Sequence, residues 1–198
     1  MELTFENPIT TPGDYLAQES NPLVHQSFTE QGKIYFLEEK FELALKYFNH
    51  SLELAVQTDS PEFFVKHYLE CLLEALEMIG NFEPVISYCD RFIGLIEDEM
   101  TNEAEQNFYL ALLYQKKGIV LIKSGKAELG KKNLENAVQI AENNNFPLLL
   151  SENVLFLLNS GINPDQRKIV QEQVQAGYFV INSETVNKEI AMKNPEIN

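Results

Sequence analysis

The 198-residue chain has two cysteines, no tryptophan and only half as many basic as acidic side chains. Cys71 and Cys89 cannot form a disulfide framework, so we expect a reducing compartment, the cytoplasm. The 15 Lys and Arg against 30 Asp and Glu give a net charge of −15, which argues against nucleic acids and anionic membranes as partners. The first residues lack the basic and apolar regions of a signal peptide, and no apolar run is long enough to span a bilayer. These absences predict an acidic protein of the cytoplasm.

The charges are unevenly distributed along the chain. Residues 1–100 contain 5 basic and 19 acidic side chains, whereas residues 101–198 contain 10 and 11. The second half includes a group of closely spaced lysines: Lys116, Lys117, Lys123, Lys126, Lys131 and Lys132. We expect these lysines to cover solvent-facing helix surface. The alternatives are a polar partner site or a contact between copies of the chain, which would make a homo-oligomer.

Apolar residues recur at steps of three and four through most of the chain, which is the spacing of an amphipathic helix. Two such stripes occupy residues 41–56 and 69–79, and the second ends at Gly80, a typical C-terminal cap. Further helical patterns occupy residues 101–125, 126–142, 146–159, 164–176 and 184–192. Only residues 178–181 have any strand character. The sequence therefore predicts an all-α fold.

Long helices alternate with short turns, and three segments align as internal repeats: residues 31–55, 72–96 and 117–141. The first and third repeats share a pattern of small and aromatic or apolar residues: Phe28, Gly32, Tyr35, Ala44 and Phe48, then Tyr114, Gly118, Gly130, Leu134 and Ala137. This pattern resembles the tetratricopeptide repeat (TPR), a helix–turn–helix unit. Small residues on both helices of a hairpin let the backbones approach closely, and the aromatic residues fill the space beside them.

The repeats are longer than in most TPR proteins. Ala44, Val85 and Gly130 occupy equivalent places at offsets of 41 and 45 residues, whereas TPR units recur at about 34. The resemblance is therefore to long-helix relatives, and residues 146–176 could form a weak fourth hairpin. It implies a right-handed stack of three to four hairpins over residues 21–177, after an extended lead-in at residues 1–20. The C-terminal segment, residues 178–198, would contain a capping helix at 184–192.

No catalytic, metal or cofactor site is predicted. Residues 125–131 match the spacing of a phosphate-binding P-loop, but Lys132 stands where that loop needs Ser or Thr. The residues inside the motif favour helix, and the repeat alignment explains both of its glycines. His67 and Cys71 are four residues apart and could share a metal, but no second His/Cys cluster completes a site. We therefore expect a protein that is not an enzyme.

In TPR arrays the first helix of each hairpin lines a concave groove, so the resemblance places partner-binding residues there. In the middle repeat, the stripe opposite the apolar one is acidic apart from one histidine: His67, Glu70, Glu74 and Glu77. The flanking repeats contribute Lys33 and Phe36, then Leu112, Gln115, Lys116 and Ile119. These residues predict an acidic centre beside an apolar floor, which would suit a basic or amphipathic protein segment.

Two alternatives remain open for the apolar part of this groove. It could bind an external segment, or it could be covered by residues 178–181 of the chain itself. The positions of a TPR carboxylate clamp are Thr29, Lys33, Cys71, Leu112 and Lys116, which disfavours an acidic C-terminal tail as ligand. The expected function is a protein-interaction module, an adaptor, scaffold or regulator. The alternative is a small chaperone-like protein that holds an exported or signalling client.

Overall fold

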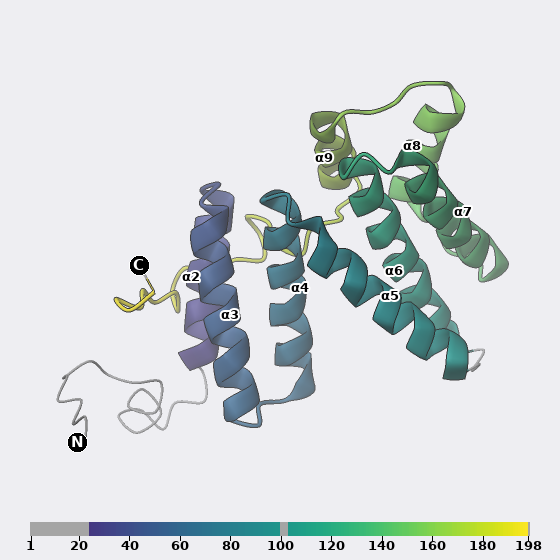
Figure 1. The fold of residues 1–198 in the computed structure, drawn as a ribbon. Coiled ribbons are helices and arrows are strands. Elements are labelled where there is room, and N and C mark those ends of the chain that lie inside the picture. Colours follow the sequence, from purple (N-terminus) through teal and green to yellow (C-terminus); the bar gives the residue numbers. More distant parts are fainter. Residues whose placement is uncertain (1–23, 100–102, 198) are drawn as a thin grey trace, which may run out of the picture. The chain divides into compact units, whose positions relative to one another are not determined.

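The computed structural model describes residues 24–99 and 103–197, and this part of the chain is all-helical. It contains eight helices and no strand (Figure 1). The helices are α2 (Val24–Leu37), α3 (Phe41–Gln57), α4 (Glu62–Met78), α5 (Phe82–Glu99), α6 (Ala104–Lys123), α7 (Ala127–Asn143), α8 (Leu149–Asn159) and α9 (Gln166–Gln175). The prediction of an all-α fold is confirmed. Within the described residues, none of these helices is both long and apolar enough to cross a membrane.

Consecutive helices pack against their neighbours, as expected for a helical repeat. Helix α2 packs on α3, α6 packs on both α5 and α7, and α8 packs on α7 and α9. The α8/α9 hairpin occupies the place of the predicted fourth hairpin, residues 146–176. Helix α9 also contacts α6, so α6 is covered on several sides. This arrangement explains why the sequence of α6 is apolar almost all round.

Seven of the eight described helices end in the same way. At seven helix ends the residue after the last turn has a positive φ, and the next N–H donates to the carbonyl five residues earlier, which is the Schellman motif. The positive-φ residues are Glu39, Asp59, Gly80, Gly125, Asn145, Gly161 and Gly177. Gly80 and Gly125 were predicted at helix ends, and both predictions are confirmed. Repeated use of one cap produces the short turns of the hairpins.

Small residues set the distance between the helices of two hairpins. A Cβ atom on Gly118 would lie 2.6 Å from Leu134 Cδ2 and 3.0 Å from the Gly130 carbonyl oxygen. A Cβ atom on Gly32 would lie 2.7 Å from Phe48 Cε1. A larger side chain at either position would force the facing Leu134 or Phe48 side chain to shift. The predicted close approach within the first and third hairpins is therefore present.

The chain divides into two compact units. In its described part, one unit comprises the chain up to Leu72 together with the chain from Ile181 onward, and the other is Leu73–Val180. The boundary falls within α4, and the prediction of a single repeat domain over residues 21–177 did not include this division. The predicted lead-in, residues 1–20, lies outside the described residues.

The predicted capping helix at residues 184–192 is wrong. Residues 181–197 form turns joined by extended stretches, and residues 178–181 form no strand. Each turn is closed by an asparagine whose Oδ1 accepts the N–H of the glutamate two residues later: Asn182 with Glu184, Asn187 with Glu189, and Asn194 with Glu196. An asparagine side chain that bonds to the following backbone competes with helix formation. The helical spacing of this segment was therefore overridden by its repeated Asn-x-Glu turns.

Candidate functional site

In the unit Leu73–Val180 a buried polar cluster centres on Glu77, near the C-terminal end of α4. Its carboxylate accepts hydrogen bonds from Lys123 Nζ at 2.8 Å, Gln173 Nε2 at 2.7 Å and the Tyr178 hydroxyl at 3.0 Å. Only 2% of Glu77 and 7% of Lys123 is exposed, so the ion pair is buried. A buried carboxylate is tolerated when a counter-ion and hydrogen bonds satisfy it, and Glu77 has both.

Helix ends place the donors of this cluster. Lys123 is the last residue of α6, and Gln173 lies in the last turn of α9. The Schellman turn after α9, with its 2.9 Å bond from Tyr178 N–H to the Gln173 carbonyl, reverses the chain and brings Tyr178 to Glu77. Burial, followed by the nearby Glu77 carboxylate, raises the pKa of the Tyr178 hydroxyl well above its usual value. The phenol therefore remains a hydrogen-bond donor at neutral pH.

Glu74 lies one turn before Glu77 on α4 and binds Val180, two residues after Tyr178. Glu74 Oε1 accepts the backbone N–H of Val180 at 2.6 Å, and 2% of Glu74 is exposed. The Tyr178 ring packs against a hydrophobic cluster that includes Ile119 and Ile169. Lys116 Nζ lies 5.8 Å from the centre of that ring, within cation–π range. Different residues therefore contact the backbone N–H of Val180, the ring of Tyr178 and its hydroxyl group.

In the other unit the chain continues along α2 through polar backbone contacts. Lys33 Nζ donates to the Thr185 carbonyl at 3.2 Å and pairs with Glu30 at 2.8 Å. The N–H of Asn187 donates to Glu30 at 2.7 Å, and the N–H of Met192 donates to the Ser27 carbonyl at 3.1 Å. Later residues of the segment meet earlier residues of α2, so the segment runs antiparallel to the helix.

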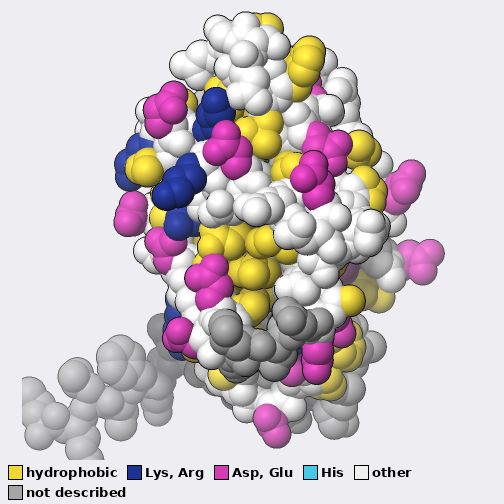
Figure 2. Space-filling view, turned by 90° about the vertical axis from the view of Figure 1, so that its right-hand side faces the viewer, with side chains coloured by type: hydrophobic (Ala, Val, Ile, Leu, Met, Phe, Trp, Pro, Cys, Tyr) yellow, Lys and Arg dark blue, Asp and Glu magenta, His cyan; other side chains and the backbone are white. Residues whose placement is uncertain are grey.

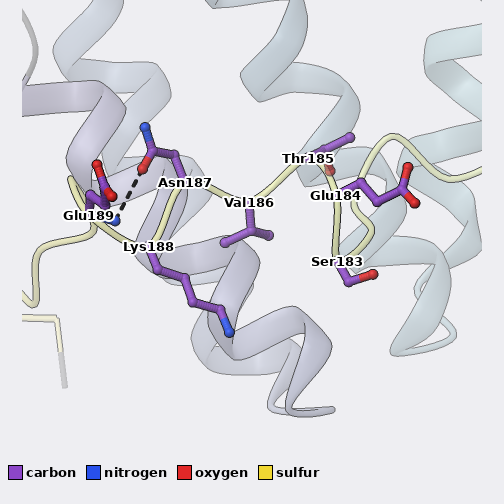
Figure 3. Close-up of a pocket in the computed structure, with 7 residues that line it drawn as sticks. All are labelled: Ser183, Glu184, Thr185, Val186, Asn187, Lys188 and Glu189. Atoms are coloured by element: carbon purple, nitrogen blue, oxygen red, sulfur yellow. Dashed lines mark hydrogen bonds between the residues drawn. The ribbon is translucent and has the colours of Figure 1, made fainter.

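The segment is also attached to α3. The N–H of Asn194 donates to the Tyr47 hydroxyl at 2.8 Å, that hydroxyl donates to the Asn194 carbonyl at 3.3 Å, and the Asn194 side chain contacts His50 Nε2 at 3.2 Å. Figure 3 shows residues 183–189 as turns at either end of a short extended stretch, with the bond from Glu189 N–H to Asn187 Oδ1 dashed. We call residues 178–197 the terminal segment.

The ten residues predicted to bind a partner fall on both units, and none of them is exposed. Lys33, Phe36, Glu74, Glu77, Gln115 and Ile119 are buried, and His67, Glu70, Leu112 and Lys116 are partly buried. The structure brings Glu74, Glu77, Lys116 and Ile119 together around residues 178–180. Lys33 contacts the terminal segment in the other unit. The prediction of an open acidic stripe on α4 is therefore wrong for Glu74 and Glu77, because both carboxylates are buried and accept hydrogen bonds from residues of the same chain.

Three further predicted residues, Gln115, Phe36 and Leu112, have structural contacts. Gln115 Oε1 accepts hydrogen bonds from the Ser151 hydroxyl at 2.9 Å and its N–H at 3.3 Å, which joins α6 to α8. The Phe36 ring packs edge-on against Phe41, with ring centres 5.2 Å apart. Leu112 packs against the cluster of Ala111, Ala137, Ala141 and Leu148. These three residues stabilise the hairpins.

His67 and Cys71 are adjacent on α4, as their spacing predicts. Cys71 Sγ lies 3.8 Å from His67 Nε2, and Cys71 is a buried free thiol. Burial is the main cause that lowers the pKa of His67, and the positive charge of Lys33 adds to this effect. No group of three or more potential metal ligands occurs within residues 24–99 and 103–197.

The six lysines of the second half do not form one solvent-facing group. Lys123 is buried against Glu77, Lys117 Nζ pairs with Asp90 at 2.5 Å, and Lys116 lies over Tyr178. Lys126 and Lys132 are exposed, as expected, and Lys131 is half-buried. On the face drawn in Figure 2, Lys and Arg side chains gather in one area beside a central group of hydrophobic side chains. The prediction of a uniformly solvated lysine surface is wrong for Lys123.

Known proteins supply no further assignment, because no protein-family model, curated protein or solved structure matches the chain.

The P-loop spacing at residues 125–131 has a purely structural explanation. Gly125 has a φ of +85° and ends α6, whereas Gly130 lies inside α7 at its closest approach to α6. A phosphate-binding loop needs a free backbone before its helix, and here the equivalent residues are already helical.

Sequence reasoning missed three contributors to the site. Gln173 shows no signal in the sequence, because its contact with Glu77 spans 96 residues. Lys123 was seen as a charge on the surface, although its place in the last turn of an apolar helix could have suggested burial. Tyr47 was not among the predicted residues, yet its hydroxyl group accepts the backbone N–H of Asn194.

Proposed function

We propose that this chain is a TPR-like protein-interaction module that binds extended polypeptide on the first helices of its hairpins, on α2 in one unit and on α4 and α6 in the other. The observation that carries the proposal is the position of the terminal segment. In each unit it lies on residues of these helices: Glu74, Glu77 and Lys116 in one, Ser27, Glu30 and Lys33 in the other. A right-handed stack of hairpins is part of the proposal.

The kind of contact supports a surface for polypeptides. The helices bind main-chain groups of the terminal segment, namely the N–H groups of Val180, Asn187 and Met192 and the carbonyl of Thr185. Main-chain recognition supplies affinity without regard to side chains, and pockets for single side chains add specificity. A surface of this kind can hold an extended segment of another protein as well as the chain's own.

The geometry gives little support to catalysis. An acid or base needs a carboxylate that can reach a substrate proton, but Glu74 and Glu77 are each 2% exposed and already accept hydrogen bonds from the chain. The same contacts change the partner chemistry that we propose. Because Lys123 neutralises Glu77, a basic partner segment is not required, and an uncharged segment with an aromatic residue fits the site better.

Site-specific photo-cross-linking tests this function. The full chain carrying p-benzoylphenylalanine in place of Lys116, on α6, is expected to cross-link to a second polypeptide in extracts of the source cell. The matched control has the same residue in place of Lys132, which is exposed on α7, the second helix of the hairpin. Equal cross-linking from both positions, or none from position 116 when the terminal segment is released, would contradict the proposal.

A further inference from the structure

We propose that the residues around Tyr178 form a recognition site for a tyrosine in an extended segment, and that Tyr178 is a resident ligand that a partner's tyrosine displaces. The inference rests on the proposed function and specifies its ligand. The site consists of Glu74 and Glu77 on α4, Lys116 and Ile119 on α6, and Gln173 on α9. All of these residues belong to the unit Leu73–Val180.

Each part of a tyrosine side chain is recognised separately. The ring lies against the apolar cluster that contains Ile119, the Lys116 ammonium group approaches within 5.8 Å of the ring centre, and the hydroxyl group donates to Glu77 at 3.0 Å. Phenylalanine would keep the first two contacts and lose the third. A site built around a hydroxyl group discriminates against the analogue that lacks it, because its polar partner then loses a bond.

The backbone adds a second requirement. Glu74 accepts the N–H of the residue two positions after the tyrosine, at 2.6 Å. Proline has no N–H, so a segment with proline at this position would leave the buried Glu74 carboxylate without that donor. The expected ligand is therefore an extended segment with tyrosine followed, two residues later, by any residue other than proline.

The contacts of Glu77 explain how Tyr178 can leave. When the phenol departs, Glu77 keeps Lys123 at 2.8 Å and Gln173 at 2.7 Å, so the buried carboxylate retains a counter-ion and a donor. Gly177, the exposed residue of positive φ before Tyr178, ends α9, so the segment can rotate there without unfolding a helix. A tethered ligand competes at an effective concentration on the order of millimolar, so an external segment must bind tightly or act on a released tail.

Fluorescence anisotropy of the full chain with a labelled peptide tests the proposal. The probe has the sequence of residues 176–184, Ala-Gly-Tyr-Phe-Val-Ile-Asn-Ser-Glu. Val180→Pro in the full chain removes the N–H that Glu74 binds and frees the site, whereas Val180→Ala keeps that N–H and is the matched control. We expect the peptide to bind the Val180→Pro chain at least tenfold more tightly than the wild type or the Val180→Ala chain.

Two peptide variants test the recognition rule on the Val180→Pro chain. The peptide with phenylalanine in place of tyrosine should bind about tenfold more weakly, the loss of one hydrogen bond to a charged acceptor. The peptide with proline at the position of Val180 should lose at least as much affinity. Equal binding of all three peptides, or no binding to a Val180→Pro chain of unchanged helicity, would overturn the proposal.

Hydrogen exchange on the wild-type chain decides the matter if Val180→Pro fails to fold. The Val180 amide should exchange through a local opening that costs less than global unfolding. If that amide exchanges only through global unfolding, the residues around Tyr178 and Val180 are a permanent part of the core. That result would overturn the proposal that a partner's tyrosine displaces Tyr178. In that case, cross-linking of a second polypeptide from position 116 would still support the proposed function, so the two failures are distinguishable.

Discussion

The Tyr178 hydroxyl group donates a 3.0 Å hydrogen bond to Glu77 across 101 residues of sequence. This bond joins the turn after the last helix to the C-terminal end of α4, where Lys123 and Gln173 already bind the same carboxylate. Two properties follow. The fold depends on both partners of the buried ion pair, because loss of one would leave the other charge buried and uncompensated, and the phenol occupies a position that another tyrosine could take.

The ion pair should be costly to break from one side. Lys123→Met removes the counter-ion of Glu77 and leaves a buried carboxylate, so we expect a loss of about 3–5 kcal/mol in the free energy of unfolding. Lys117→Met is the control, because Lys117 pairs with Asp90, which is 53% exposed, and its loss should cost less than about 1 kcal/mol. Urea unfolding of both variants measures the difference, and equal losses would contradict a buried role for Lys123.

Replacement of Gly118 and of Gly94 by alanine should change the stability of the protein in opposite directions. At Gly118 the new Cβ would lie 2.6 Å from Leu134 and 3.0 Å from the Gly130 carbonyl, so Gly118→Ala should destabilise the protein by about 1–3 kcal/mol. At Gly94, inside α5, the new Cβ meets nothing within 4 Å, so Gly94→Ala should stabilise by about 0.5–1 kcal/mol through helix propensity. Thermal unfolding followed by circular dichroism compares the two, and a stabilised Gly118→Ala variant would refute close packing of α6 on α7.

Stability should fall as the pH decreases below neutrality. Burial lowers the pKa of His67 and of His50, so in the folded state both stay neutral at pH values where the unfolded state, with a pKa near 6.5, takes up protons. The unfolded state is therefore favoured as the pH falls from about 6.5 toward the folded pKa values. His67→Gln should flatten the pH dependence of the urea midpoint between pH 7 and 5. An unchanged slope would show that His67 has the same pKa in both states.

Nucleotide binding should be absent despite the P-loop spacing at residues 125–131. Gly130 is buried inside α7, and its N–H donates to the Lys126 carbonyl at 2.9 Å, so this amide is not available to a phosphate. Isothermal titration with ATP and magnesium should give no heat beyond dilution. A saturable heat signal that Lys131→Ala removes would contradict this explanation of the glycines.

Much of the helical architecture could be predicted from the sequence because its signals are local. The apolar stripes and Gly80 or Gly125 indicate where helices lie and end, and the small residues of the first and third repeats indicate close hairpins. Other helix ends have no such signal, because Glu39 and Asp59 adopt the left-handed conformation that usually favours glycine. The segment 184–192 has helical spacing, but its Asn-x-Glu turns and its contacts with α2 override it.

The candidate site could be predicted only in part, since its contacts are long-range. The three- and four-residue spacing correctly placed Glu74 and Glu77 on one face of α4. Burial of that face depends on Tyr178 and Val180, which lie more than 100 residues further along the chain. Two occupants of the groove were left open by the sequence, residues 178–181 of the chain itself and an external segment. The contacts of Tyr178 and Val180 with α4 and with the cluster around Ile119 agree with the first of these. The charge of Lys123 gave no indication that it lies buried beside Glu77.

Nuclear magnetic resonance of the full chain tests the central claim most directly. In isotope-labelled wild-type protein, an excess of the unlabelled peptide of residues 176–184 should move the backbone amide signals of Tyr178 and Val180 to positions typical of disordered chain. The amide signals of Glu74, Glu77 and Lys116 should remain dispersed, because the peptide takes the place of the tail. If the Tyr178 and Val180 signals stay in place at saturating peptide, the terminal segment is a fixed part of the fold and the account is contradicted.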